Sequence, residues 1–438
     1  MPLAMEADRD WVNQNLIWLH KCCLDPWNSV RSIDFTLDQF PHTFGSAQPT
    51  AEVMLDDLCA LLTLPRERMA VEFFEDVRDI KNMPLEIHGL PPSSDLVVDE
   101  GKDGKRYRVQ IATAIREHPR LVLKHCILEA CQIVAHECAM DTAGEDNAQV
   151  KELFAVYLGF GTVLARGRVE VLYKHDGLWE EKVRYGSALP MPMFAYALAL
   201  NGRIGQFSDG DLLRPLPNEV KEEVKVALAW MAGSGADDPD LSRFEREYGI
   251  MELQRTADMH LARYEYDLAI EYYRKVLFTS EDPSEKAIMH NNIGYAHCCV
   301  GQFEKSLKSF ETALSMEPEF AYAMDNMGFA LIMMGELETG KTYLDHAFRT
   351  PGNHPGYSHR NLALYYWKKG DRSNAGKHFD QAFQGHGEVD FLDFFVANFL
   401  IEDRKLDEAR PHAERAASRN EPGAVELLAG IDELIANR

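Results

Sequence analysis

The residues best suited to do chemistry lie in one apolar helical stretch, where His136 is followed by Glu137 and, after two more residues, by Met140. Two histidines one helical turn apart, with a glutamate after the first, bind Zn²⁺ and polarise a bound water. Here Met140 stands where the second histidine is needed, and a thioether sulfur is a poor ligand for Zn²⁺. The spacing therefore predicts a metal site that has lost one ligand.

Nearby side chains do not replace the missing ligand if the helix is regular. Cys138 lies almost opposite His136 around the helix, and Asp141 is about 140° away from it. His125 is on the right face but about 16 Å away along the helix axis. None of the three can share a metal ion with His136.

The segments around this helix resemble those of zincin-like metallopeptidases. A predicted strand over residues 106–111 precedes the helix, and an apolar helical segment bearing Glu152 follows it. The resemblance extends over about residues 69–200 and implies a zincin-like α+β domain in which Glu152 is an acidic ligand. His136 and Glu152 are then the implied metal ligands and Glu137 the implied catalytic residue, each of them functional or vestigial.

Three interpretations of this site stay open, the third being a regulatory pseudoenzyme whose cleft still binds a peptide without cutting it. In the first, the domain is a catalytically inactive pseudoenzyme without a cofactor, and His136 hydrogen-bonds Glu152 or Glu137. In the second, the protein is a zinc-dependent metallopeptidase, and the rest of the chain recruits its substrate. The missing histidine favours the first interpretation, because two ligands bind zinc weakly.

The last 190 or so residues repeat with a period of about 34. Gly294 and Gly328 are 34 residues apart, and so are Ala313 and Ala347. Each unit carries two apolar helical stripes separated by a short turn. This pattern of small residues resembles the tetratricopeptide repeat, a helix hairpin that stacks into a curved solenoid. A glycine inside a helix is costly, so we expect close helix packing at Gly294 and Gly328.

The resemblance implies five such units, from about Ile250 to Pro422, and a capping helix over Ala424–Asn437. In tetratricopeptide arrays the first helix of each pair lines a concave groove that holds another protein or peptide. The polar and aromatic residues on that side of the first helices are the predicted protein-binding residues. They are Asn291, Tyr295, Tyr322, Asp325, Phe329, Tyr357, Arg360, Trp367, Phe391, Phe394 and Asn398.

Aromatic residues interspersed with Arg and Asn suit an extended peptide, since they supply contact area and a few polar anchors. For Phe329 and Phe394 a place in the core between repeats is an equal alternative.

A small, acidic segment with a proline, residues 231–240, is the predicted linker. It separates an α+β domain, residues 1–230, from the all-α solenoid, residues 241–438. In the first domain the patterns predict helices over 10–23, 51–62, 121–140, 148–165, 192–200 and 217–231, strands over 69–74 and 106–111, and a hairpin over 169–185.

The composition narrows the range of partners and compartments. The 438 residues carry a formal net charge of −24, which disfavours nucleic acid and anionic membranes as partners. No apolar run approaches the roughly 20 residues of a membrane span, and the N-terminus lacks a signal-peptide core. The eight cysteines form no CxxC pair and are expected to be free thiols in a reducing compartment. We therefore expect a cytoplasmic, bacterial interaction scaffold, with its partner and oligomeric state undetermined.

Overall fold

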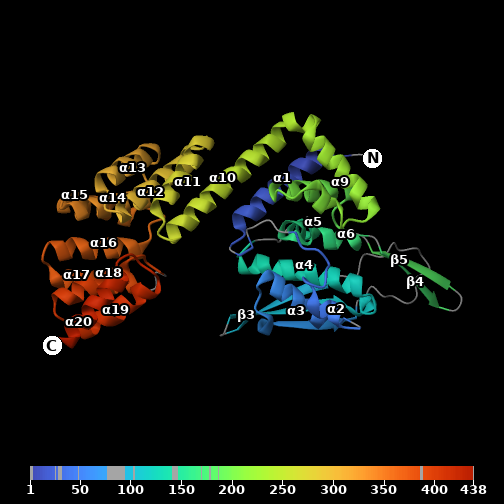
Figure 1. Ribbon diagram of the computed structural model, residues 1–438, viewed down its shortest axis with the longest axis horizontal. Helices are drawn as coiled ribbons and strands as arrows, with labels where there is room; N and C mark the ends of the chain where they lie inside the picture. Colours follow the sequence, from blue (N-terminus) through green and yellow to red (C-terminus); the bar gives the residue numbers. More distant parts are fainter. Residues whose placement is uncertain are drawn as a thin grey trace. The chain divides into compact units, whose positions relative to one another are not determined.

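The computed structural model (Figure 1) describes the chain except for residues 1–2, 25, 28–31, 48, 76–93, 102–103, 141–146, 169, 177–178, 186, 385–387 and 438. The chain divides into unit 1, Met1–Tyr248, and unit 2, Gly249–Arg438. Residues 231–240 end one helix, form a short turn and begin the next helix. The predicted domain limits, 1–230 and 241–438, stay a prediction.

Unit 1 is mostly helical. Its helices are α1 (Glu6–Cys22), α2 (Pro41–Gly45), α3 (Ala51–Leu62), α4 (Pro119–Glu137), α5 (Asn147–Ala155), α6 (Gly161–Arg166), α7 (Met191–Ile204), α8 (Asp209–Leu213) and α9 (Asn218–Ala232). A π-helical turn, Val156–Phe160, joins α5 to α6. Helix α4 packs against both α3 and α5 (Figure 1), and most of its residues are buried. A helix that is apolar on nearly every side is expected at such a central position.

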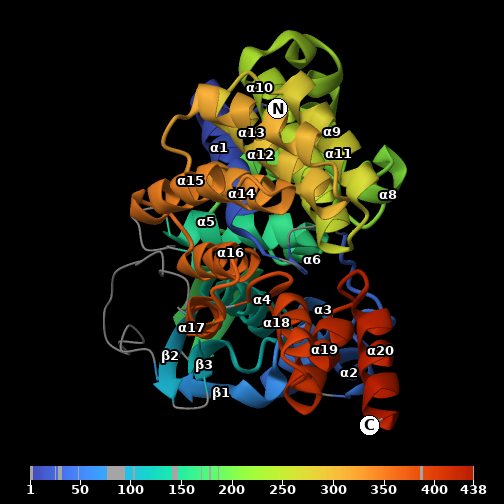
Figure 2. The ribbon, with the colours of Figure 1, turned by 90° about the vertical axis from the view of Figure 1, so that its left-hand side faces the viewer.

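A three-stranded sheet, seen in Figure 2, accompanies α4. Its strands β1 (Met69–Phe74), β3 (Gly104–Ala112) and β2 (Ser94–Gly101) lie in that order, with β1 parallel and β2 antiparallel to β3. Alternate residues of β3 are buried, and the strand contacts α4. Strands β4 (Glu170–Asp176) and β5 (Trp179–Tyr185) form the predicted hairpin. The sheet agrees with the expected α+β class, whereas the zincin-like fold stays a prediction.

The pattern predicted β1 and α3 at their observed bounds, but it missed β2 and misplaced the end of α4. Strand β2 carries three acidic residues among eight, and acidic residues are uncommon in strands. Helix α4, predicted to reach residue 140, ends at Glu137, because Ala139 has a left-handed φ of 53°. The amide of Met140 then donates to the carbonyl of Ala135 (2.9 Å) and closes the helix end.

Unit 2 consists of helix pairs. Its helices are α10 (Pro239–Ala262, shared with unit 1), α11 (Tyr266–Thr279), α12 (Pro283–Cys299), α13 (Phe303–Met316), α14 (Ala321–Met334), α15 (Leu337–Arg349), α16 (Pro355–Lys368), α17 (Arg372–Phe383), α18 (Leu392–Glu402), α19 (Leu406–Ser418) and α20 (Ala424–Ala436). Helix α12 packs on α13, α14 on α15, α16 on α17 and α18 on α19, while α20 covers α19. The first helices α12, α14 and α16 also contact one another in sequence. This is the tetratricopeptide-type array that the period predicts.

Two glycines explain why the period is so clear. A Cβ atom on Gly294 would lie 2.5 Å from the ring of Phe310, and one on Gly328 would lie 2.6 Å from Leu344. In each pair, therefore, only glycine lets the second helix approach this closely. In the part of the chain that the structure describes, no helix is long and apolar enough to cross a membrane.

Candidate functional site

A ladder of hydrogen-bonded polar side chains joins the first helices of unit 2. Asn326 of α14 donates to Asn291 of α12 (3.0 Å), and Asn361 of α16 donates to Asp325 of α14 (2.6 Å). These four residues, which we call the polar ladder, meet because equivalent helices of a repeat present the same positions to their neighbours. The ladder holds α12, α14 and α16 in register.

Asp325 is the buried carboxylate of this ladder. Its second oxygen accepts a hydrogen bond from the hydroxyl of Ser358 (2.7 Å). Burial raises the pKa of Asp325 to about 6, and the hydrogen bonds from Ser358 and Asn361 oppose that rise. Both carboxylate oxygens thus serve packing within the array, and Asp325 is not available to a ligand.

Arg360 is buried as well, with 2% of its surface exposed. Its guanidinium donates to the side-chain oxygen of Asn361 (2.9 and 3.0 Å) and to the backbone carbonyl of Asp390 (2.6 Å). The same group lies over the rings of Tyr357 and Phe329, at 5.1 and 5.4 Å from their centres. Arg360 therefore fastens the start of α18 to α16.

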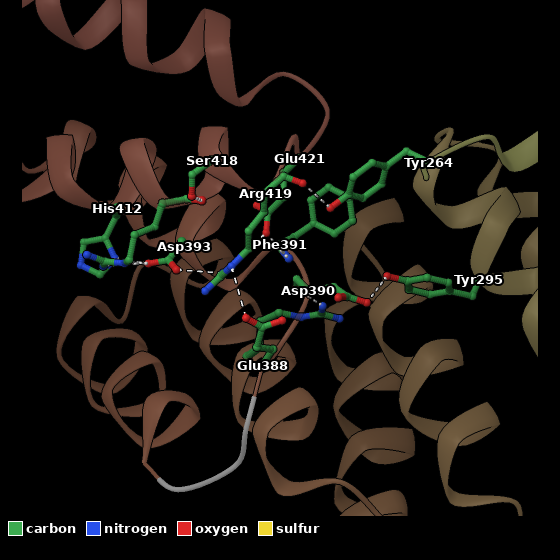
Figure 3. Close-up of polar contacts among 12 residues, drawn as sticks. Tyr264, Tyr295, Glu388, Asp390, Phe391, Asp393, His412, Ser418, Arg419 and Glu421 are labelled. Carbon is green, nitrogen blue, oxygen red and sulfur yellow. Dashed lines mark hydrogen bonds and ion pairs between the residues drawn. The ribbon is translucent and has the colours of Figure 1, made fainter. Parts of the chain in front are cut away.

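The array also closes on itself at this point (Figure 3). The hydroxyl of Tyr295, on α12, donates to the carboxylate of Asp390 (3.0 Å). The ring of Phe391 meets that of Tyr264 edge-to-face, with 6.1 Å between centres, and the Tyr264 hydroxyl donates to the carbonyl of Arg419 (3.3 Å). Residues from α12 and from the segment before α11 thus pack against the start of α18.

A second buried charge lies in the last repeat (Figure 3). The carboxylate of Asp393 accepts hydrogen bonds from Arg415 (2.8 Å), Arg419 (3.1 Å) and His412 (2.6 Å). Burial by itself would raise the pKa of Asp393, but the hydrogen bonds from His412 and Arg415 lower it. This cluster could not be predicted from the repeat, because it occurs in one unit only and gives no periodic signal.

Several of the predicted binding residues are packed between helices. Trp367 makes an edge-to-face contact with an aromatic ring of α18, with 5.6 Å between centres. Phe329 and Phe394 both pack against Phe395, at 6.3 and 6.0 Å. The amide of Asn398 donates to the carbonyl of Phe394 (2.8 Å). The contacts of Trp367 and Phe329 join different helices, whereas those given for Phe394 and Asn398 lie within α18.

One predicted residue stands apart, because Tyr322 of α14 is 43% exposed. Ile288 occupies the same position of the preceding repeat, 34 residues earlier on α12, and is 38% exposed. We call these two residues the open stripe. Ile288 is not among the predicted binding residues, although its spacing of 34 residues from Tyr322 is a signal for it. Phe320 flanks the stripe through an edge-to-face contact with Tyr322, with 6.4 Å between ring centres.

The predicted metal site in unit 1 has a different arrangement. His136 lies in the last turn of α4, where burial and the charges of Lys105 and Lys151 lower its pKa. Within the described residues, the hydrogen bond at His136 goes from Lys105 to its backbone carbonyl, and its ring has no hydrogen-bond partner. Glu137 accepts a hydrogen bond from the hydroxyl of Tyr107. Glu137 is thus already engaged with β3.

Glu152 is held by other partners. One of its carboxylate oxygens accepts from Arg168 (2.9 Å), and the other accepts from the amides of Ala188 (2.7 Å) and Leu189 (3.0 Å). Glu152 forms no hydrogen bond with His136 or Glu137, so the structure does not bring the three implied site residues together. Both Glu152 and Arg168 are buried.

These residues do not fit a zinc site. Met140 lies beyond the end of α4, so the position of the lost histidine is not one helical turn from His136. Among the described residues, no group of three or more His, Cys, Asp and Glu side chains is placed to hold a metal ion. Asp141 lies outside those residues.

No family model matches the chain. Among curated proteins, protein FlbA of Caulobacter vibrioides is 32% identical over 69 residues, which are 16% of this chain and 12% of FlbA. The photosystem I assembly protein Ycf3 of Rippkaea orientalis is 29% identical over 72 residues, which are 16% of this chain and 42% of Ycf3. The chain thus spans less than half the length of either relative.

Three solved structures show weak likeness. A tetratricopeptide repeat protein of Thermus thermophilus is 18% identical, covers 43% of this chain and 99% of its own, and has a TM-score of 0.36. The type IV pilus biogenesis factor PilW is 18% identical, with coverage of 43% and 86% and a TM-score of 0.33. A tetratricopeptide repeat protein of Parabacteroides merdae is 15% identical, with coverage of 55% and 87% and a TM-score of 0.33. The tetratricopeptide-type organisation of unit 2 stands on its own helix pairs and glycine spacing.

Proposed function

We propose that this protein is an interaction scaffold in which the repeat array of unit 2 binds another protein or peptide. The observation that carries the proposal is the open stripe, two large apolar side chains exposed at equivalent positions of neighbouring first helices. Large apolar and aromatic side chains are the usual energetic centres of protein interfaces. The hydrogen bond between Asn326 and Asn291 joins α12 to α14, the two helices that carry the stripe, so the surface is organised before a partner arrives.

Of the predicted binding residues, the proposal retains Tyr322 as the main contact. Truncating Arg360 would leave the oxygen atoms of Asn361 and Asp390 without their buried donor, which costs stability by itself. Truncating Trp367 would open a gap against α18. Neither substitution separates binding from folding, so the open stripe is the better place for a test.

Site-specific photocrosslinking tests the proposal in the source cells. A photoreactive phenylalanine analogue is placed at Tyr322 in one variant and at Phe278 in a control variant. Phe278 is 94% exposed on α11, a second helix, so the control is at least as accessible to chance encounters. The proposal predicts a discrete crosslinked partner from Tyr322 that is missing from Phe278. The same pattern of products from both positions would contradict it.

We further propose that unit 1 is a catalytically inactive, zincin-like domain. Met140 beyond the helix end and the Glu152–Arg168 ion pair both support this proposal. The alternative is a zinc-dependent metallopeptidase whose array recruits substrate. The inactive form should hold less than about one tenth of an equivalent of zinc after purification. Met140→His should not raise that content, because residue 140 lies off the helix. Stoichiometric zinc with peptide hydrolysis would establish the alternative.

The proposed setting is the bacterial cytoplasm. All eight cysteines are free in the structure, which suits a reducing compartment. Alkylation of thiols in intact source cells, followed by mass spectrometry, should find them reduced. Disulfide-linked peptides from the native protein would contradict this setting.

A further inference from the structure

A cavity of about 480 Å³ lies in unit 1 between α2, α3, α4 and α6, which Figure 1 labels. Its lining includes the buried side chains of Leu123 and Ile127 from α4. Phe44 of α2 also lines it and is 45% exposed, so this ring stands where the cavity meets solvent. The volume falls within the roughly 300–1,000 Å³ that small-molecule sites occupy.

The charges around this cavity have one sign. Arg120, Lys124 and Arg166 line it, and no acidic side chain is among the described residues of the lining. The whole chain has 70 acidic and 46 basic residues. A cavity whose charged lining residues are all basic therefore differs from the average composition of the chain. Arg120 and Arg166 are exposed, whereas Lys124 is buried. A largely apolar lining with basic side chains matches a ligand that has an apolar body and an anionic end.

Helix α2, which forms one wall of the cavity, is held in place by hydrogen bonds to α3. The buried carboxylate of Asp57, on α3, accepts from the amide and the hydroxyl of Thr43 (2.8 and 2.6 Å) and from the amide of His42 (3.1 Å). These bonds fasten the short helix α2 to α3, so the cavity does not depend on a loose segment. Asp57 itself is turned toward α2 and is not part of the lining.

We propose that this cavity binds an aliphatic carboxylate, the anion of a fatty acid. The hydrocarbon chain lies against Leu123 and Ile127. The carboxylate is attracted by the exposed Arg120 and Arg166 and by the buried Lys124. A small inorganic anion would leave the apolar lining unused, and a nucleotide base would find few polar groups there. The site lies in unit 1 and is independent of partner binding by the array.

Calorimetric titration of the full chain with decanoate, below its micelle concentration, tests the proposal. We expect saturable binding of one decanoate per chain. Decan-1-ol should bind roughly tenfold more weakly, because it lacks the charge that the cations attract. Octanoate should bind on the order of tenfold more weakly than decanoate, because each buried methylene contributes roughly fourfold. Added salt should weaken decanoate binding and leave decan-1-ol binding unchanged.

Variants locate the site. Arg120→Gln with Arg166→Gln should weaken decanoate binding by roughly fivefold, as loss of partly exposed charges does. Lys221→Gln with Lys225→Gln, on α9, removes the same charge elsewhere in unit 1 and should change nothing. Leu123→Trp fills the cavity and should abolish binding of both ligands. The proposal is overturned by absence of saturable decanoate binding, by equal affinity for decan-1-ol, or by an Arg120/Arg166 variant that binds decanoate as the α9 control does.

Discussion

The polar ladder of unit 2 and the Glu152–Arg168 pair of unit 1 use buried polar groups in different ways. In unit 2, the ladder residues of α12, α14 and α16 repeat one contact from helix to helix. In unit 1, the Glu152–Arg168 pair is a single buried ion pair whose other bonds go to backbone groups. A repeated contact spreads its contribution to the free energy of folding over several repeats, whereas a solitary buried pair concentrates that contribution at one place. Neither contact was predicted as such, because the sequence patterns assign Asn291 and Asp325 to ligand binding and Glu152 to a metal.

The largest expected effect comes from breaking the solitary pair. Arg168→Ala should destabilise unit 1 by about 3–5 kcal/mol, because it leaves the Glu152 carboxylate buried without its cation. Arg166→Ala, two positions away and exposed, should change the stability by about 0.5 kcal/mol or less. The free energy of opening is measured by native-state hydrogen exchange of the α5 amides. Similar values for the two variants would show that the pair does not hold unit 1 together.

The next largest expected effect is a change in the stability of unit 2 with pH. The pKa of Asp325 in the folded protein is about 6, above the 3.8 of a solvent-exposed aspartate, so the folded state binds the proton more tightly. The stability of the array should therefore rise as pH falls from about 6 to about 4, by about 3 kcal/mol at most. The Asp325→Asn variant should lack this rise in stability, because it has no carboxylate at this position to protonate. We would compare urea unfolding of the two proteins across this pH range, and parallel curves would contradict the assignment.

A glycine pair tests the close packing of the repeats. Gly328→Ala places a Cβ atom 2.6 Å from Leu344 and 2.9 Å from the carbonyl oxygen of Gly340, and should cost about 2 kcal/mol. Gly430→Ala, in α20, meets nothing within 4 Å and should stabilise its helix by about 1 kcal/mol. Thermal unfolding of both variants shows whether each substitution stabilises or destabilises the protein. A neutral Gly328→Ala would mean that α15 can move away.

The contact that closes the array gives the smallest effect. Tyr295→Phe removes the hydroxyl that donates to Asp390 and should cost about 1 kcal/mol. Tyr322→Phe removes an exposed hydroxyl and should cost less than about 0.5 kcal/mol. Hydrogen exchange at the start of α18 reports the difference. If hydrogen exchange is unchanged in Tyr295→Phe, the hydrogen bond from α12 does not hold the start of α18 in place.

Sequence patterns predicted most of the helices and much of the sheet, because apolar periodicity and turn residues act locally. The end of α4 was missed because the left-handed backbone at Ala139, which no glycine announces, stops the helix before Met140. The sequence patterns predict Asp325 and Arg360 as ligand contacts, whereas the structure buries both side chains among hydrogen-bond partners. The Tyr264–Arg419 contact joins residues 155 positions apart and leaves no local trace in the sequence.

The measurement that tests the account most directly is the affinity of the array for the partner that Tyr322 crosslinks. Ile288→Ala with Tyr322→Ala should weaken that affinity by at least about 2 kcal/mol, roughly thirtyfold, as truncation of interface centres does. Phe278→Ala removes an even more exposed side chain and should leave the affinity unchanged. If the double variant binds the partner as tightly as the Phe278→Ala control while keeping its helical signal, the open stripe is not the binding site.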